Sequence, residues 1–243
     1  NNMWQDTCLI LTTDHGVLLG EHDWWSKNRM PVFDEISRIP LMVYHPEFAE
    51  QSVTRRKSLT QSIDIMPTIM ELHDHTIPED VSGKSLIPLL AEDSPVRSTA
   101  MFGYFGAACN ITDGTHVYHR YPENLSADGL YEYTLMPTRM TSRFPISDLV
   151  GATLTDPFKF TKGAPVMKLK PRTNEEGNPV ECQGMSFDNT KTQLYNLDTD
   201  PKQENPITNP EIEAKLVAEM IHHMKCADAP AEMYARFNLE LDN

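Results

Sequence analysis

The sequence of 243 residues lacks any hydrophobic run long enough to cross a membrane and lacks closely spaced cysteines. Its longest apolar runs, TCLIL and IPLMVY, fall far short of the roughly 20 residues that a membrane helix needs. No leader peptide is visible, because residue 1 stands just before a strand-like run; we expect the chain to start inside a domain, which leaves localisation open. The four cysteines form no CxxC motif, so we expect buried or free thiols: Cys8, Cys109, Cys182 and Cys226.

Positive charge is also scarce, since 21 Lys and Arg face 35 Asp and Glu and give a net charge of −14. An acidic chain is poorly suited to binding bulk phosphate, so nucleic acid is excluded as a partner. Any anionic substrate would need a local positive site set against this field. The number of subunits cannot be inferred from these numbers.

The first 92 residues alternate strand-like and helix-like patterns. The β-branched run at residues 7–13 predicts a buried strand that ends in Asp-His-Gly, and residues 39–44 predict a second strand. A helix is predicted from Asp64, its N-cap, with Ile65, Ile69 and Leu72 on one face. This order predicts an α/β unit, in which ligands bind at the carboxyl ends of the strands.

The composition changes after residue 92, so residues 93–243 are predicted to form a smaller subdomain. Asp113-Gly114 predicts a β-hairpin, whereas residues 122–190 are rich in Pro, Gly and polar residues and predict long irregular connections. The clearest helix begins after Asn209, with Pro210 in its first turn, and its apolar stripe consists of Ile212, Leu216, Met220 and Met224.

Three residues near the end of the first strand can do chemistry. Asp14 and His15 could share one metal ion, but a lone Asp-His pair is more often a capped turn with a hydrogen-bonded histidine. Lys27 could hold an anionic oxygen, or it could lie across the faces of Trp24 and Trp25.

The spacing of these residues resembles the sulfatases of the alkaline phosphatase superfamily. The stretch reads TTDHG, LLGEH and WWSKN, where that family has Ser/Thr-Asp-His/Asn-Gly, Leu-Gly-Glu/Asp-His and Trp-x-Lys. Further along, four more segments resemble the family in the same order: RIPLMVYHPE, SIDIMPTIMEL, VSGKSLIPLL and LYNLDTDPKQENPI. The resemblance implies the C-terminal part of the family's α/β/α core for residues 1–92, followed by a small antiparallel sheet and a terminal helix in residues 93–243.

The resemblance also implies roles for these residues. Asp14 and His15 would be two ligands of a divalent metal, and Lys27 would bind a sulfate oxygen and act in catalysis. Ca²⁺ is the metal usual in the family, but imidazole is an unusual calcium ligand, so Mn²⁺, Mg²⁺ and Zn²⁺ stay open. His22 matches the motif and is predicted to order the turn. The implied substrate is a small sulfated molecule, a sugar or aryl sulfate. Tyr104, Tyr118 and Tyr121 could stack on its ring, or they could simply belong to the core or the surface.

The family's nucleophile, a Cys or Ser oxidised to formylglycine in Cys/Ser-x-Pro-Ser/Thr-Arg, has no counterpart in this chain. LMPTR matches only from Pro137 to Arg139, with Leu135 where the nucleophile should stand, so we treat it as coincidence. We therefore expect a C-terminal portion of a sulfatase that is inactive alone, with formylglycine in a preceding part. Two alternatives remain, a phosphonate or phosphate diester hydrolase of the same superfamily and a non-catalytic sulfatase-like module.

Overall fold

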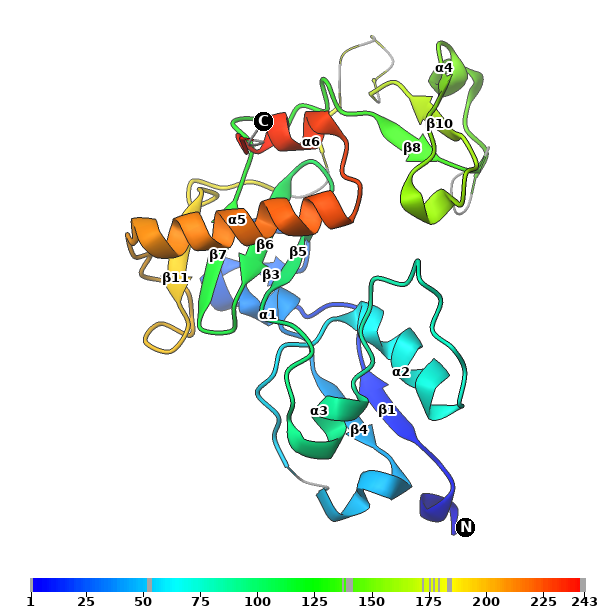
Figure 1. Ribbon diagram of the computed structural model, residues 1–243. Coiled ribbons are helices and arrows are strands. Elements are labelled where there is room, and N and C mark those ends of the chain that lie inside the picture. Colours follow the sequence, from blue (N-terminus) through cyan, green and yellow to red (C-terminus); the bar gives the residue numbers. More distant parts are fainter. Residues whose placement is uncertain are drawn as a thin grey trace.

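A computed structural model describes residues 2–51, 54–136, 138, 142–171, 173–174, 176, 178, 180–182 and 185–240. Its elements run from the N-terminal strands at the lower end of Figure 1 to the C-terminal helices at the upper end. Within the described residues, no helix is long and apolar enough to span a membrane. All four cysteines are free, as the sequence predicts.

The N-terminal layer contains a two-stranded antiparallel sheet with short helices beside it. Strand β1 (Leu9–Thr12) pairs with β4 (Leu41–Tyr44), and α2 (Ile65–Leu72) and α3 (Ile87–Glu92) lie beside them. A 3₁₀ turn at Met3–Gln5 precedes β1, and further 3₁₀ turns span Pro46–Gln51 and Ser62–Asp64.

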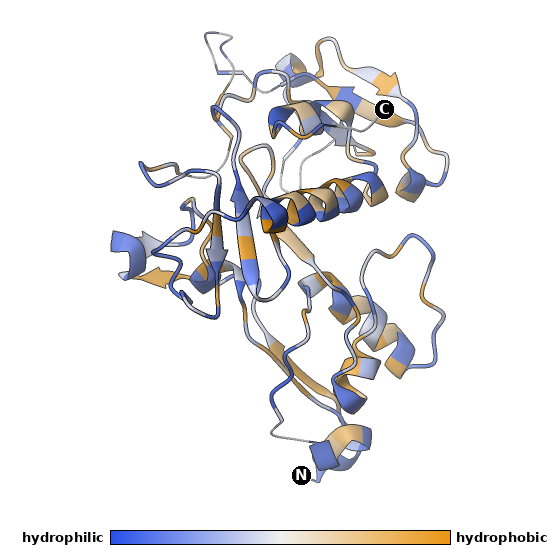
Figure 2. Ribbon diagram, turned by 60° about the vertical axis from the view of Figure 1, so that its left-hand side comes forward, coloured by the Kyte–Doolittle hydropathy of each residue, from blue (hydrophilic) through white to orange (hydrophobic). Residues whose placement is uncertain are grey.

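The burial expected in this layer is wrong. In β1, Leu9 is 49% and Leu11 57% exposed, because β1 pairs with β4 alone. The predicted stripe of α2 is not its buried face either: Pro67 and Thr68 are buried, whereas Ile69 is exposed. Figure 2 shows the apolar colour on the paired strands that rise from the N-terminal end. Hydrogen bonding of Thr68 to the Asp64 carbonyl and to the Leu86 amide fixes the inner face of α2 instead.

A second layer is an antiparallel sheet in the order β11-β7-β6-β5. Its strands are β5 (Ala100–Tyr104), β6 (Ala108–Thr112), β7 (His116–Arg120) and β11 (Gln193–Asn196). The predicted hairpin joins β6 and β7. There the Asp113 carboxylate accepts the amide hydrogens of Thr115 and His116, and Gly114 takes the positive φ that favours glycine.

Helices α5 (Pro210–Cys226) and α6 (Ala231–Arg236) cover one face of this sheet (Figure 1). The side chain of Asn209 accepts the Ile212 amide hydrogen at 3.2 Å and caps α5, as predicted. The predicted stripe is confirmed, since Leu216, Met220 and Met224 are buried against Ile111, Tyr118 and Leu194 with Ile212 packed beside them.

The opposite face of the sheet is covered by the segment that follows Asp-His-Gly. This segment holds the short hairpin β2 (Leu18–Leu19) and β3 (Trp25–Ser26), a 3₁₀ turn at Glu21–Asp23, and α1 (Asp34–Ser37). Leu18, Met30, Val32 and Ile36 form one buried cluster with Ala107 and Ala108 at the start of β6. The sequence motifs are therefore folded directly onto the C-terminal sheet.

A third sheet lies inside the region predicted to be irregular. Strands β8 (Glu132–Thr134), β10 (Val166–Leu169) and β9 (Thr153–Thr155) pair in that order, with α4 (Ile146–Leu149) and a 3₁₀ turn at Lys159–Thr161 between them. Three strands of three or four residues give too few alternating positions for a periodicity signal. The boundary between residues 92 and 93 stays a prediction.

Candidate functional site

The loop after β1 exposes a charged carboxylate. Asp14 Oδ1 accepts the His15 backbone amide at 3.1 Å and the Thr13 hydroxyl at 3.2 Å. Hydrogen bonds from the Asp14 and His15 backbone amides and from Thr13, together with the neighbouring imidazole, lower the pKa of Asp14 below its ordinary value. Asp14 is therefore ionised at neutral pH and available as an oxygen ligand.

The ring of His15 has one nitrogen committed to the backbone. Nδ1 lies 2.9 Å from the Gly16 carbonyl oxygen, which can only accept, so Nδ1 carries the proton. The lone pair is then on Nε2, which lies 3.4 Å from Asp14 Oδ2 and 2.6 Å from Lys27 Nζ. This is the tautomer that a metal ligand needs, and its second-nitrogen hydrogen bond is the usual way in which such a ring is oriented.

Gly16 shows why the motif contains glycine. Its amide donates to the Ile36 carbonyl at 2.8 Å, and a Cβ at this position would lie 1.9 Å from the Glu35 carbonyl oxygen. No side chain fits in that space, so any other residue would displace the loop that carries Asp14 and His15.

Lys27 reaches the same point from the other side. It follows β3, and its backbone carbonyl accepts a 2.8 Å hydrogen bond from the Tyr104 hydroxyl on β5. Burial raises the pKa of Tyr104, so this hydroxyl stays a donor. The Lys27 amine contacts His15 Nε2, whereas Trp25 beside it is 72% exposed. The structure thus brings Asp14, His15 and Lys27 together; the role of each stays a prediction.

His22 orders the turn between β2 and β3. Its ring stacks on Phe33 with centroids 3.5 Å apart, and Nε2 lies 3.7 Å from Glu35 Oε2. Its backbone has a positive φ of 51°, and its carbonyl accepts a 2.7 Å hydrogen bond from Arg29. These contacts match the turn-ordering role predicted for it.

Arg29 is a residue that sequence reasoning missed. It is buried, bonds Asn189 at 2.7 Å and holds its guanidinium 4.4 Å from the Phe187 ring centroid. Burial lowers its pKa, although arginine stays charged at physiological pH. The sequence offered no signal for this role except that Arg29 stands two residues after Lys27. Its partners Asn189 and Phe187 lie about 160 residues further along the chain.

The remaining candidates do not join the site. Tyr118 is in the core; burial of Tyr121 raises its pKa, and its hydroxyl contacts His119 Nδ1 at 3.1 Å. Pro137 and Arg139 of LMPTR lie outside the described residues. Among the residues that are described, no group of three His, Cys, Asp or Glu could hold a metal ion. Asp14 and His15 are two adjacent donors of types that a metal can use, and their role as metal ligands stays a prediction.

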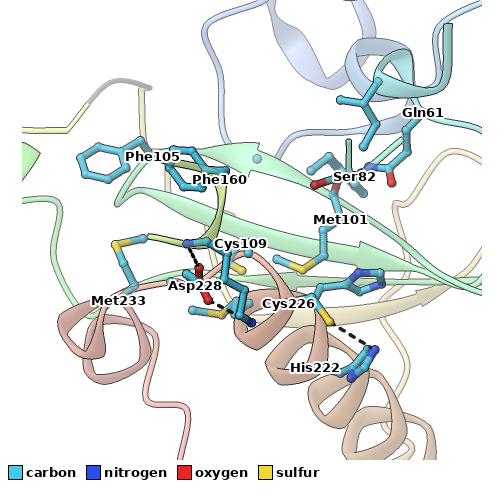
Figure 3. A pocket seen from close by; sticks show the side chains of 18 of the residues that line it. Gln61, Ser82, Met101, Phe105, Cys109, Phe160, His222, Cys226, Asp228 and Met233 are labelled. Atoms are coloured by element: carbon cyan, nitrogen blue, oxygen red, sulfur yellow. Dashed lines mark hydrogen bonds and ion pairs between the residues drawn. The ribbon is translucent and has the colours of Figure 1, made fainter. Parts of the chain in front are cut away.

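A hollow among the described residues lies beside this site and does not include it. About 1340 Å³ in volume, it is bounded by β5, the loop at 79–84, the turn at 159–162 and the end of α5 (Figure 3). Asp14, His15 and Lys27 do not line it, but Tyr104 does. Tyr104 thus connects the hollow to the Lys27 segment.

Comparison with known proteins gives a consistent set of similarities. A family described as N-sulphoglucosamine sulphohydrolase, C-terminal, matches residues 20–120, which include Lys27. An N-acetylglucosamine-6-O-sulfatase of Bacteroides thetaiotaomicron is 29% identical over 104 residues, which are 41% of this chain and 18% of that protein. The multifunctional alkaline phosphatase superfamily protein PehA of Trinickia caryophylli is 37% identical over 92 residues, 38% of this chain and 18% of its own length.

A solved structure extends the similarity to almost the whole chain. An enzyme in complex with its substrate D-glucosamine-2-N,6-O-disulfate superposes with a TM-score of 0.54 at 16% identity, covering 94% of this chain and 36% of its own. The fold expected from the motifs is thereby confirmed. The chain spans about a fifth of the length of the curated relatives named above and just over a third of this solved structure.

Proposed function

Because this chain belongs to the sulfatase family, we propose that it carries half of a metal-assisted site that hydrolyses the sulfate ester of a small sulfated sugar or aryl compound. The single observation that supports this proposal is the convergence of three groups. The Lys27 amine lies 2.6 Å from His15 Nε2, and that nitrogen lies 3.4 Å from Asp14 Oδ2. An ammonium and two metal donors in contact suit a tetrahedral oxyanion such as the sulfate ester monoanion.

In the proposed mechanism Lys27, Asp14 and His15 together offset the negative charge of the sulfate group. Lys27 donates a hydrogen bond to an equatorial oxygen of the sulfate group and offsets the negative charge that grows there in the transition state. Asp14 and Nε2 of His15 would hold a divalent cation, with Ca²⁺ expected from the family resemblance and Mn²⁺, Mg²⁺ or Zn²⁺ as alternatives that suit imidazole better. When bound, such a cation would supply Lewis acidity to the sulfate group. The Gly16 carbonyl keeps the His15 proton on Nδ1, so Nε2 stays a donor to the metal.

The proposal places the nucleophile outside this chain. Covalent hydrolysis of a sulfate ester needs an activated nucleophile, and the 243 residues contain no Cys/Ser-x-Pro-Ser/Thr-Arg motif. We therefore expect no turnover of 4-nitrophenyl sulfate by the chain alone, and turnover by the full-length protein. Both proteins are assayed at equal concentration with Ca²⁺, Mn²⁺, Mg²⁺ and Zn²⁺ in turn. Turnover by the chain alone would contradict the division of the site, and an inactive full-length protein that binds metal would favour a non-catalytic module.

The metal assignment has its own test. We expect Asp14→Ala to weaken binding of the activating cation to the full-length protein by roughly 100-fold, since one charged ligand and the orientation of His15 are lost together. Titration calorimetry after removal of bound metal measures this directly. Asp6→Ala, another exposed aspartate ahead of β1, is the matched control. Equal affinity in Asp14→Ala and wild type would remove Asp14 from the ligand set.

A phosphonate or phosphate diester hydrolase is the second candidate. It is favoured by the 37% identity to PehA, a multifunctional protein of the alkaline phosphatase superfamily. The same three groups can serve either anion, because sulfate and phosphate esters are tetrahedral with similar oxygen positions. The ratio of kcat/KM on 4-nitrophenyl sulfate and on a phenyl phosphonate monoester decides between the two in one enzyme preparation.

A further inference from the structure

A positively charged region stands out in this acidic chain. Residues 142–171 contain five Lys or Arg and only two Asp, whereas the whole chain carries a net charge of −14. They include β9 and β10, which form the three-stranded sheet together with β8, at the upper right of Figure 1. We call β8, β9 and β10 with their connections the β8–β10 module. β8 adds the acid Glu132, and Lys159 and Lys162 pair with acids outside the module, so the positive charge that the module offers to a ligand lies at Lys168 and Lys170.

The β8–β10 module is held in a fixed place on the rest of the molecule. The Tyr133 hydroxyl donates to Glu232 of α6 at 2.5 Å, and burial together with this hydrogen bond raises the pKa of Tyr133. The Lys159 amide and amine both bond Asp228 in the turn between α5 and α6 (Figure 3). Lys162 pairs with Asp80 at 3.2 Å. Lys159 and Lys162 are therefore used to anchor the module.

Two other lysines face a hollow of about 460 Å³ in this module. Lys168 and Lys170 are two residues apart along β10 and its continuation, so they lie on one face, while Leu169 between them is buried. Among the described residues neither amine forms an ion pair. The side chain of Lys170 crosses Gly151, where a Cβ would lie 2.7 Å from its amine. Gly151 thus leaves room for the lysine to line the hollow.

The hollow has the mixed chemistry of a saccharide site. The Lys168 amine lies 3.8 Å from the ring centroid of Tyr131, which fixes the amine without neutralising it. Asp128 and Thr153 line the same hollow and offer a carboxylate and a hydroxyl. A carboxylate repels a bare anion but accepts hydrogen bonds from sugar hydroxyls. Two amines, an aromatic ring, a carboxylate and a hydroxyl together suit a sugar that bears an anionic group.

We propose that this hollow, centred on Lys168, Lys170 and Tyr131, binds one sulfated sugar unit of a longer anionic glycan, away from the residues at Asp14, His15 and Lys27. The inference rests on the proposed function, because a protein that hydrolyses the sulfate ester of a sugar encounters sulfated saccharides as its ligands. Its volume lies within the range typical of small-ligand sites. The site retains a polymer and does not touch the bond that is hydrolysed.

Affinity electrophoresis of the full-length protein tests the proposal. Heparin, a sulfated glucosamine-containing polymer, is cast in the gel, and heparosan, which lacks sulfate, is the comparison. We expect the pair Lys168→Ala and Lys170→Ala to weaken heparin retardation about tenfold, and Asp128→Ala to weaken it about threefold. The pair Lys168→Arg and Lys170→Arg should keep most of the retardation, since charge is conserved. Hydrolysis of 4-nitrophenyl sulfate should stay within twofold of wild type in all variants.

The matched control removes the same charge elsewhere. Lys191→Ala with Lys202→Ala alters two exposed lysines outside the β8–β10 module and should leave retardation within twofold. If the Lys191/Lys202 pair weakened heparin retardation as much as the Lys168/Lys170 pair, the proposal would be overturned in favour of general charge attraction. Retardation of the wild-type protein by polyuridylate equal to that by heparin would have the same meaning. Normal aryl sulfate turnover with unchanged heparin affinity in the alanine pair would overturn this inference alone. Selective heparin binding without any sulfate turnover would instead reject the proposed function and leave the glycan site standing.

Discussion

Lys27→Ala is expected to lower kcat of the full-length protein on a sulfate ester by about 10²–10³-fold, the loss typical of one preorganised transition-state donor. The amine of Lys27 is positioned by the β2–β3 hairpin and by the Tyr104 hydrogen bond to its carbonyl. Its truncation removes the positive charge beside His15 without changing the backbone. Steady-state kinetics on 4-nitrophenyl sulfate at saturating metal measure the effect, with KM changing less than kcat.

Two companion variants make the result specific. Lys27→Arg keeps the charge but replaces a compact ammonium by a planar guanidinium, so we expect an intermediate loss. Lys191→Ala replaces an exposed lysine that is distant from Lys27 in the sequence, and it should change kcat by less than twofold. A Lys27→Ala enzyme with wild-type kcat would show that the amine only packs against His15.

The second large effect concerns stability and lies at Asp64. This carboxylate is completely buried and accepts the backbone amides of Gln61 at 2.7 Å and Lys84 at 2.8 Å, along with the guanidinium of Arg97. We expect Asp64→Ala to lower the free energy of unfolding by about 3–5 kcal/mol, because it leaves Arg97 buried without its counter-ion and two amides without an acceptor. Urea unfolding followed by tryptophan fluorescence measures the change.

A paired substitution separates charge from packing at this position. Asp64→Leu combined with Arg97→Met removes both charges, so it should be less destabilising than the sum of the two single changes. Glu71→Ala, an exposed acid on α2, is the control and should stay within about 0.5 kcal/mol of wild type. An Asp64→Ala protein as stable as the control would show that water replaces the carboxylate.

The parts of the fold that sequence predicted are those specified locally. Asn209 and Pro210 define the start of α5, and Asp113-Gly114 defines the β6–β7 turn, because each signal acts within a few residues of itself. The β8-β10-β9 sheet was missed, since pairing of Lys168 with Tyr133 joins residues 35 apart in the sequence. Burial of β1 was overestimated because apolar composition does not tell how many neighbouring strands are present.

The candidate site shows the same division. The resemblance of the motifs that contain Asp14, His15 and Lys27 to those of sulfatases was enough to predict that they meet. It could not predict the proton on Nδ1 of His15, which depends on where the Gly16 carbonyl points. Nor could it predict Tyr104, considered as a stacking residue, as the hydrogen-bond donor to the Lys27 carbonyl. Both facts are set by tertiary packing.

The β5–β6 hairpin contacts both the segment that carries Lys27 and the residue that holds Gly16 in place. Tyr104, at the end of β5, fixes the strand that presents the amine. Ala107 and Ala108, three and four residues later, support Ile36, whose carbonyl fixes the glycine beside the imidazole. The Lys27 segment and the Gly16 turn are therefore both held by the same hairpin. A displacement of this hairpin would move the Lys27 amine and the His15 ring together and keep the distance between them.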